Sequence, residues 1–285
     1  MSGTLYVVAT PIGNLEDITL RALRILREEV AMIACEDTRQ TQKLLDHYQI
    51  KKPLISYHEH NEASRTAEIL DSLERGHSVA LVSDAGTPLV SDPGYRVVKA
   101  ATDRSYRVVP LPGPSAVLAA LAGSGLPTDE FRFIGFLPSK AGARRKALVE
   151  MLDSPGTVIA YESPHRILDT LAEIAEIVGN APIVLAREIT KIHEEFLRGS
   201  AASIREQLAQ RASVKGEITL VIGRPEKNTS SLSDPMTEVL RLEAEQGLDR
   251  MQAVKTVAKQ LGLPKREVYR LAAERGNNPV RKNRA

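Results

Sequence analysis

The stretch V-A-L-V-S-D-A-G-T-P-L-V-S-D-P-G, residues 79–94, is the one around which the chain is organised. Its first part, Val79–Val82, is apolar and β-branched, which predicts a buried strand. The strand ends at small residues, a carboxylate, a glycine and a proline, and ligands of open α/β sheets bind at the carboxyl ends of strands. We therefore expect Asp84 to accept hydrogen bonds from a ligand. The alternative is an ordinary turn stabilised by an aspartate side chain.

Strands and helices alternate on both sides of this stretch, which predicts a mainly parallel sheet whose loops gather at one edge. The first helix is expected to be capped by Asp17, and the helix before the central strand to stop at Gly76. The other strands of this first half are expected at residues 5–9, 31–35, 54–57 and 106–111.

A segment rich in Gly, Pro and Asp, residues 123–130, indicates a boundary, and a second α/β domain is expected after it. Its expected strands are 131–135, 158–161, 183–186 and 218–222, with helices at 144–152, 165–178 and 202–210. The sequence thus predicts two α/β domains (1–125 and 126–224), a polar linker (225–233) and a small helical domain (234–285).

The composition excludes several classes of protein. The chain has 285 residues, one cysteine and no tryptophan, so its core must be aliphatic and it has no internal disulfide. No apolar run reaches the length of a membrane span, and the first residues do not resemble a signal peptide, so a cytoplasmic protein is expected. The net charge is only +2, but basic residues outnumber acidic ones after residue 233, which favours an acidic partner such as nucleic acid.

Several familiar site motifs are absent. No G-x-G-x-x-G opens a helix after a strand, and there is no phosphate-binding G-x-x-x-x-G-K-[ST] loop. His58 and His60 resemble a metal-binding pair, but no further ligands at zinc spacing complete it, so no metal is expected.

Strand after strand instead ends in a loop with glycine, proline or charged residues, which a ligand cleft requires and core packing does not. In chain order, these loops and their flanks read A-T-P-I-G-N-L-x-D-I-T-x-R-A (9–22), C-E-D-T-R (35–39), S-D-A-G-T-P-x-x-S-D-P-G (83–94), P-G-P-S-A (112–116), Y-E-S-P-H-R (161–166) and A-R-E-x-T-K-x-x-E (186–194). Together these motifs resemble the tetrapyrrole-methylase-like superfamily and, within it, the bacterial 16S ribosomal RNA cytidine 2′-O-ribose methyltransferases.

The resemblance implies two α/β domains with S-adenosylmethionine bound in the cleft between them, and usually a homodimer. The first loop departs from the G-x-G-P-G of the tetrapyrrole branch, which argues against a porphyrinoid substrate. Carried over position by position, the implied cofactor-binding residues are Pro11, Asp84, Gly86, Thr87, Ser115, Ala116, Tyr161, Glu217 and Ile218.

Methyl transfer to a ribose hydroxyl needs alignment and a group that takes a proton. The leading candidates for that group are Glu36, Asp37 and Glu162, among several carboxylates expected at the same sheet edge, which also include Glu188 and Glu194. The alternative for Asp37 is that it only caps the following helix.

Three cations beside these carboxylates, Arg39, Arg166 and Lys191, are candidates for contacts to RNA phosphates, although each is as readily explained by an ion pair. A further basic patch, Lys140, Arg144 and Arg145, is expected in a Gly/Ala loop and at the start of the helix that follows it. Cations are unfavourable at a helix amino terminus, which favours phosphate binding over a structural role for this patch.

Residues 248–273 read as a helix, a short turn and a basic helix, the pattern of a helix-turn-helix. Lys265, Arg266 and Arg270 are expected to bind RNA, and the alternative is a packing unit or a dimer contact. The apolar faces are expected to consist of Met251, Val254, Val257, Ala258 and Leu261 on the first helix and Val268, Leu271 and Ala272 on the second.

Three functions compete at this point. The first is a ribose methyltransferase acting on 16S ribosomal RNA in the small ribosomal subunit. The second is a methylase of a tetrapyrrole or another small molecule, against which the altered first loop and the basic carboxyl end count. The third is a DNA-binding regulator with a ligand-sensing domain. The helix-turn-helix pattern supports this function, but the many strand ends with glycine, proline or charged residues do not.

Overall fold

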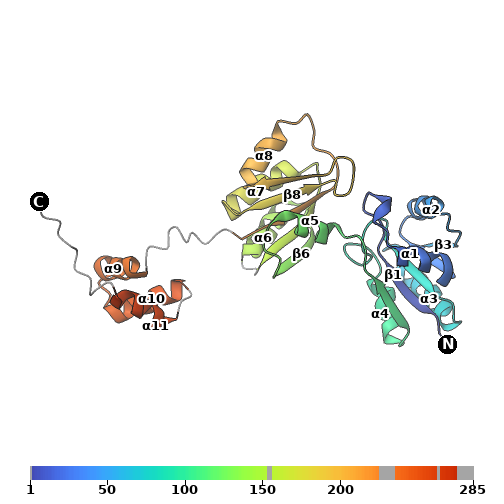
Figure 1. Cartoon of the computed structure of the whole chain (residues 1–285), viewed down its shortest axis with the longest axis horizontal. Coiled ribbons are helices and arrows are strands. Elements are labelled where there is room, and N and C mark those ends of the chain that lie inside the picture. Colours follow the sequence, from blue (N-terminus) through green and yellow to red (C-terminus); the bar gives the residue numbers. More distant parts are fainter. Residues whose placement is uncertain (1, 153–155, 225–234, 262–263, 275–285) are drawn as a thin grey trace, which may run out of the picture. The chain divides into compact units, whose positions relative to one another are not determined.

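A computed structural model describes residues 2–152, 156–224, 235–261 and 264–274. The chain divides into two compact units, Met1–Pro225 and Glu226–Ala285. Within the described residues, the first unit contains two five-stranded sheets and the second contains three helices, which Figure 1 labels. The predicted linker, 225–233, lies outside the described residues.

The first sheet is entirely parallel, as the alternation of strands and helices predicts, with the strand order β3-β2-β4-β1-β5. The residues of the central stretch form β4, which lies between β2 and β1. The strands are β1 (Thr4–Val8), β2 (Met32–Cys35), β3 (Leu54–Ser56), β4 (Val79–Val82) and β5 (Arg107–Leu111).

Helices cover both faces of this sheet, and β4 is buried on both. Alternate side chains of a strand point to opposite faces, so Val79 and Leu81 pack with α3 (Glu62–Glu74) and α4 (Tyr95–Asp103). Ala80 and Val82 pack on the other face with α1 (Leu20–Arg24) and α2 (Thr38–His47). The helix after β4 therefore lies on one face of the sheet, and the helices after its neighbours β1 and β2 lie on the other face. Such a divergence opens a crevice at the carboxyl ends of the strands.

The cap of the first helix differs from the sequence prediction. Asp17 ends a single 3-10 turn, Leu15–Asp17, and Thr19 caps α1 by accepting a hydrogen bond from the backbone N–H of Ala22 at 3.1 Å. Aspartate is a common capping residue, but here Thr19, two residues after Asp17, has the extended backbone that a cap requires and the side chain that accepts the hydrogen bond.

The second sheet has the order β6-β7-β10-β8-β9 and is mostly antiparallel, since only β6 and β7 run parallel among its neighbouring strands. The sequence analysis does not predict its edge strand β9, because a five-residue segment with only two apolar side chains, Phe196 and Leu197, carries little periodic signal. The strands are β6 (Phe131–Phe136), β7 (Thr157–Glu162), β8 (Ile183–Arg187), β9 (Glu195–Gly199) and β10 (Ile218–Ile222).

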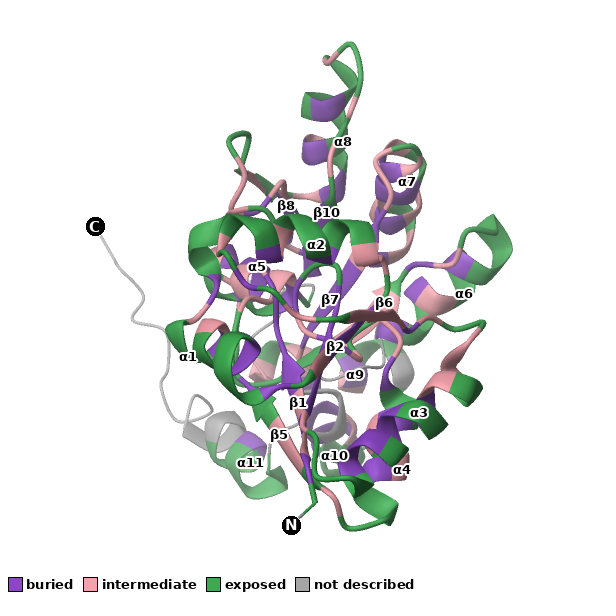
Figure 2. Cartoon of the chain, turned by 90° about the vertical axis from the view of Figure 1, so that its right-hand side faces the viewer, coloured by how far each residue is buried: buried purple, intermediate pink, exposed green. Residues whose placement is uncertain are grey.

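Three helices, α6 (Ala141–Leu152), α7 (Ile167–Val178) and α8 (Ala201–Ala209), contribute to the main core of this sheet. The opposite face packs against α5 (Ala116–Ser124), through Val117, Ala120 and Leu121. The predicted boundary at residue 125 therefore follows a helix whose apolar side chains belong to the core of the second sheet. In Figure 2 the central strands of both sheets are coloured as buried, and the helices beside them are buried on one side and exposed on the other.

In its described residues the second unit consists of α9 (Pro235–Gln246), α10 (Arg250–Leu261) and α11 (Lys265–Glu274). The last two lie where the sequence predicts a helix, a short turn and a basic helix. Its core contains Val239, Leu242, Ala253, Val254, Val257, Ala258 and Val268. Met251 was predicted to lie in this core, but its side chain is 61 % exposed. The predicted core positions Leu261, Leu271 and Ala272 are not among the side chains that the structure describes.

Within the described ranges, no helix is both long and apolar enough to span a membrane. The same part of the chain contains no group of three or more side chains arranged to bind a metal ion.

Candidate functional site

A cleft of about 690 Å³ lies within the first unit, between the loops of the two sheets. The loops after β4 and β5 line one side. The ends of β6 and β7, the loop after β8 and the start of β10 line the other. This volume is within the range of about 300–1,000 Å³ that is usual for small-molecule sites.

The loop after β4 is fixed to the loop after β1 by paired backbone hydrogen bonds. The N–H of Thr10 donates to the carbonyl of Gly86, and the N–H of Gly86 donates to the carbonyl of Thr10, both at 2.9 Å. The Ser83 hydroxyl donates to the same Gly86 carbonyl at 2.8 Å. Gly86 has a φ of +82°, a conformation that favours glycine, and an added Cβ would lie 3.3 Å from Cγ2 of Ile12. The cleft floor is therefore a rigid backbone surface with Ile12 beside it.

Asp84 is exposed at this edge, as the sequence predicts, and lines the cleft. Its Oδ1 accepts a hydrogen bond from the backbone N–H of Asp37 at 3.0 Å, which joins the ends of β4 and β2. A carboxylate with four acceptor positions and one protein donor retains capacity for hydroxyl or ammonium groups of a ligand.

Three further predicted cofactor residues of the first half line the cleft. Thr87 donates a hydrogen bond to the carbonyl of Pro114 at 3.2 Å, which ties the loop after β4 to that after β5. Ser115 caps α5, and Ala116 begins it, so the positive end of this helix faces the cleft. Pro11 lies next to the lining residue Ile12 but does not line the cleft itself.

On the opposite side, the loop after β8 is held by a compact charge cluster. The Glu188 carboxylate accepts from the Lys191 ammonium and from the backbone N–H of Glu217, both at 2.9 Å. The same ammonium lies 3.1 Å from the Glu217 carboxylate. Thr190 contacts the loop after β1, since its hydroxyl accepts from the backbone N–H of Asn14 at 3.2 Å. This contact joins the loop after β8 to the loop after β1.

Aromatic side chains supply an apolar wall. Tyr161 packs edge-on against Phe133 and Phe136, with ring centroids 4.9 and 5.3 Å apart. Burial raises the pKa of Tyr161, and the nearby carboxylates Asp92 and Glu217 raise it further. Tyr161 therefore presents a neutral ring to the cleft, close to Ile218, which was also predicted to contact the cofactor.

Asp92, which the sequence analysis did not select, is the most perturbed acid of the cleft. Burial raises its pKa to about 6, and the nearby carboxylates Glu36 and Asp84 contribute to the shift. The loop that carries it has two non-glycine residues with positive φ, Leu89 at +72° and Ser91 at +67°. Such strained conformations cluster at functional sites. The sequence did hold a signal, because S-D-P-G (91–94) repeats the pattern of S-D-A-G (83–86).

The three carboxylates predicted to be catalytic have different surroundings. Glu36 is exposed as a residue, but neighbouring groups partly desolvate its carboxyl group, and this desolvation raises its pKa. Repulsion from Asp84 raises the Glu36 pKa further. Asp37 caps α2 and pairs with Arg39, whose hydrogen bonds lower the Asp37 pKa to about 2. The capping alternative therefore describes the contacts that Asp37 makes, and a carboxylate of such low pKa is a weak base.

Glu162 lines the cleft but is only 2 % exposed. One oxygen accepts from the backbone N–H of Ser163 at 2.6 Å and from the Arg166 guanidinium, and the other accepts from the Thr170 hydroxyl at 2.7 Å. Both oxygens are thus engaged, which favours a structural role over proton transfer.

The cations predicted to bind RNA are mostly engaged in ion pairs in the first unit. Arg144, a predicted contact to RNA phosphates, is only 5 % exposed and makes two hydrogen bonds to Glu173, at 2.6 and 2.9 Å. Arg145 pairs with Glu176 at the surface. The other members of this set are Arg39 paired with Asp37, Arg166 paired with Glu162, Lys191 within the Glu188–Glu217 cluster, and Lys140, which is exposed.

Residues 4–205 match the family described as Tetrapyrrole (Corrin/Porphyrin) Methylases. The chain belongs to this family. Within it, the chain is 46 % identical to "Ribosomal RNA small subunit methyltransferase I" of Halalkalibacterium halodurans, over 94 % of each chain. It is 48 % identical to the protein of the same name from Micromonospora olivasterospora, over 96 % of this chain and 88 % of that one.

Solved structures of the family confirm the predicted fold. Diphthine synthase has a TM-score of 0.58 at 14 % identity, covering 78 % of this chain and 90 % of its own. Uroporphyrin-III C-methyltransferase of Thermus thermophilus, solved with S-adenosyl homocysteine, has a TM-score of 0.54 at 19 % identity, covering 78 % of this chain and 97 % of that one.

Proposed function

We propose that this protein transfers a methyl group from S-adenosylmethionine to the ribose 2′-hydroxyl of a cytidine in 16S ribosomal RNA. The observation that carries the proposal is the identity of 46 % over 94 % of both chains with a ribosomal RNA small subunit methyltransferase I. The cleft supports it, because it combines an apolar wall with carboxylates and a helix amino terminus.

The residues of the cleft fit S-adenosylmethionine. The aromatic wall at Tyr161 and Phe136 suits the adenine ring, and the positive end of α5 suits the amino-acid carboxylate. Asp84 suits the ribose hydroxyls or the ammonium group, since its carboxylate accepts hydrogen bonds. The left-handed Gly86 lets the bound molecule approach the backbone. Bound there, S-adenosylmethionine supplies a methyl carbon attached to a positively charged sulfur.

The protein's own tasks are then to align the hydroxyl and to accept its proton. Holding two reacting groups in line accounts for a large part of such catalysis without a metal. We assign the proton acceptor to Asp92, because its pKa of about 6 leaves it ionised but still basic near neutral pH. Glu36 is the nearest alternative, since it lies close enough to Asp92 to raise its pKa. In this proposal, Asp37 caps α2 and Glu162 binds Arg166 and Thr170, so both stabilise the structure around the site.

The partner is, in this proposal, the small ribosomal subunit or its RNA, and the protein acts in the cytoplasm as a homodimer. The basic residues Lys265, Arg266 and Arg270 of the second unit are exposed and suit contacts to RNA phosphates. In the first unit, the exposed cations Arg39, Lys140 and Arg145 are better suited to RNA than the buried Arg144.

The test is methyl transfer from radiolabelled S-adenosylmethionine to small ribosomal subunits that lack the modification, followed by nuclease digestion and nucleoside analysis. Label in 2′-O-methylcytidine is the expected result. Label in a base, or in a tetrapyrrole offered as an acceptor while ribosomal subunits and naked RNA stay unlabelled, would overturn the proposal. Analytical ultracentrifugation of the purified protein tests the dimer separately.

A further inference from the structure

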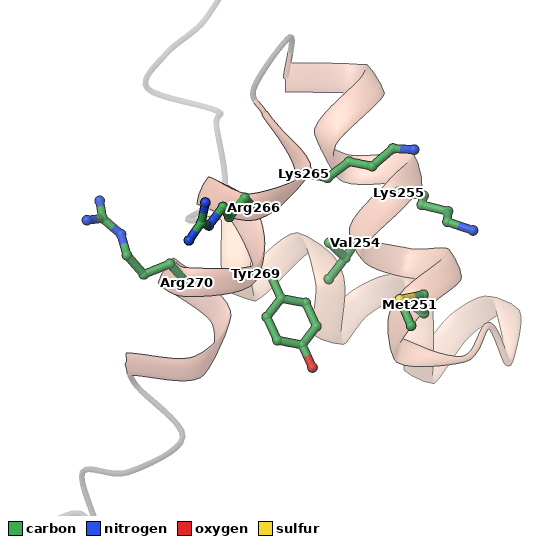
Figure 3. A pocket seen from close by; sticks show the side chains of 7 residues that line it. All are labelled: Met251, Val254, Lys255, Lys265, Arg266, Tyr269 and Arg270. Atoms are coloured by element: carbon green, nitrogen blue, oxygen red, sulfur yellow. The ribbon is translucent and has the colours of Figure 1, made fainter.

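A groove between α10 and α11 in the second unit combines exposed apolar side chains with basic ones. Packing of the unit's core does not account for the exposed apolar side chains, and a purely basic surface would not contain them. It has a volume of about 450 Å³. Figure 3 shows Tyr269 at its centre, with two arginines to one side of the ring and the apolar and lysine side chains of the groove to the other. The lining residues are Met251, Val254 and Lys255 of α10 and Lys265, Arg266, Tyr269 and Arg270 of α11.

The apolar side chains at the edges of the groove are exposed to solvent and do not belong to the core of the unit. Tyr269 is 53 % exposed and Met251 is 61 % exposed, whereas Val254, at 4 %, forms the floor between them. The core of the unit contains Val254 and Val268 but neither Met251 nor Tyr269. An exposed aromatic ring beside a flexible thioether and an apolar floor is a surface on which a flat apolar ring can stack.

The charged part of the groove has one sign. Four of its lining residues, Lys255, Lys265, Arg266 and Arg270, are cations, and none of the lining side chains that the structure describes is acidic. Lys265 and Tyr269 are four residues apart on α11, and so are Arg266 and Arg270, so each pair projects from one face of the helix. A ligand that places a ring on Tyr269 therefore has cations on both sides of it.

A nucleotide of a single strand has this combination of a flat base and flanking phosphates. Proteins bind single-stranded RNA by stacking unpaired bases on aromatic side chains while cations contact the backbone. A duplex offers no base face to a ring on the protein surface, and the deep, narrow major groove of A-form RNA does not admit a helix. The groove therefore suits an unpaired nucleotide better than it suits a duplex bound by a helix-turn-helix.

We propose that the α10–α11 groove binds an unpaired nucleotide of the RNA substrate, with its base stacked on Tyr269 and its phosphates contacted by Lys255, Lys265, Arg266 and Arg270. The choice of RNA rests on the proposed function, but the binding mode is independent of catalysis. The groove then serves as a docking site that holds substrate RNA while a different segment occupies the cleft of the first unit.

The experiment measures binding of a fluorescently labelled, unstructured 12-nucleotide RNA to the full-length protein by anisotropy, without cofactor. Tyr269→Ala is expected to weaken binding about ten-fold, because the stacking surface is lost. Tyr269→Phe keeps the ring and is expected to bind as the unchanged protein does. Tyr95→Ala, which removes another exposed tyrosine from α4 in the first unit, is the matched control and is expected to leave the affinity unchanged.

Salt titration separates stacking from charge. Lys265→Gln and Arg266→Gln should each reduce the dependence of log affinity on log salt concentration by about one phosphate contact, whereas Tyr269→Ala should leave that slope unchanged. Circular dichroism and thermal unfolding check that the helices of each variant stay folded.

Equal affinity of Tyr269→Ala and the unchanged protein for the single strand would overturn the inference, and so would equally tight binding of an RNA duplex of the same length. These results are distinguishable from failure of the proposed function. If the protein transferred methyl groups but Tyr269→Ala did not weaken RNA binding, only the proposed docking site would be refuted. If RNA binding depended on Tyr269 but no methyl transfer occurred, only the proposed activity would be refuted.

Discussion

The carboxylate of Asp84 and the backbone N–H of Asp37 are hydrogen-bonded at 3.0 Å, so one side chain joins the ends of two neighbouring parallel strands. The same carboxylate faces the cleft and lies near Asp92 and Glu36, whose pKa values it helps to raise. Asp84 therefore has two effects: it is positioned to bind a ligand, and its charge influences the neighbouring acids.

Replacing Asp84 by alanine should weaken S-adenosylmethionine binding by about ten-fold to a hundred-fold, the effect of losing a hydrogen bond to a charged group. Asp84→Asn keeps an acceptor for the Asp37 N–H and should lose less. Isothermal titration calorimetry measures both, with Asp103→Asn on the surface of α4 as the control. Unchanged affinity of the alanine variant would exclude Asp84 from the cofactor site.

Asp92→Asn should lower kcat by a factor of about 10² to 10⁴, the usual contribution of a general base, while leaving S-adenosylmethionine affinity largely unchanged. The pKa of Asp92 is about 6 in the folded protein, and only its ionised form accepts a proton, so activity should rise with pH through that value. A profile of kcat against pH, corrected for folded fraction, tests this. If Asp92→Asn retained both its kcat and the acidic limb, the proton acceptor would be another group.

The same pKa has a consequence for stability. Because Asp92 binds its proton more tightly when folded than the usual pKa near 4 allows, protonation favours the folded state. This contribution is fully present below about pH 4 and is lost as the pH rises through about 6. Urea unfolding across this range should therefore show that Asp92→Asn is more stable than the unchanged protein at pH 7, with a smaller difference at pH 4. An equal difference at both values would contradict the burial of this group.

Glu162→Gln should lower the free energy of unfolding by about 3 kcal/mol, because it removes the charge that offsets Arg166 while leaving the Thr170 hydroxyl a partner. Urea unfolding measures this, and Glu176→Gln, at an exposed ion pair with Arg145, is the control with an expected change near zero. A large fall in kcat of the folded enzyme without a loss of stability would instead indicate that Glu162 is a catalytic group.

Glu195 should contribute to acid resistance of the second sheet. Hydrogen bonds from Arg211, one of them 3.0 Å long, and the nearby Arg187 lower its pKa to about 2. A lowered carboxyl pKa stabilises the folded state above the unfolded value near 4.3, and this contribution is lost as the pH falls toward 2. Glu195→Gln should thus cost about 2 kcal/mol at pH 7 and much less at pH 2.5. The free energies of unfolding at the two pH values decide the matter, and equal losses at both would contradict the prediction.

The positions of most strands and the presence of a ligand edge could be predicted from local patterns. Val79–Val82 is apolar throughout because both faces of β4 are covered, and such a run is recognisable without its neighbours. Asp84, Gly86 and Ser115 could be selected because loops at the carboxyl ends of strands carry ligands, and all three line the cleft.

The partners of charged side chains could not be predicted in the same way. Arg144 and Glu173 are 29 residues apart in the chain, and α6 and α7 bring them within 2.6 Å. Glu162 likewise became a braced, buried group because α7 places Thr170 beside it. A charge at the start of a helix looks the same in sequence whether it faces water or a buried partner.

By itself, the sequence determined where strands and helices alternate, which strand ends carry ligand-type loops, and the family to which the chain belongs, since these depend on residues close together in the chain. Only the tertiary structure decided that α5 joins the core of the second sheet, that Asp92 is half-buried among acids, and that Met251 and Tyr269 share an exposed groove. The reason is physical: burial, pKa and groove composition depend on which distant side chains meet, and that is set by packing rather than by local periodicity.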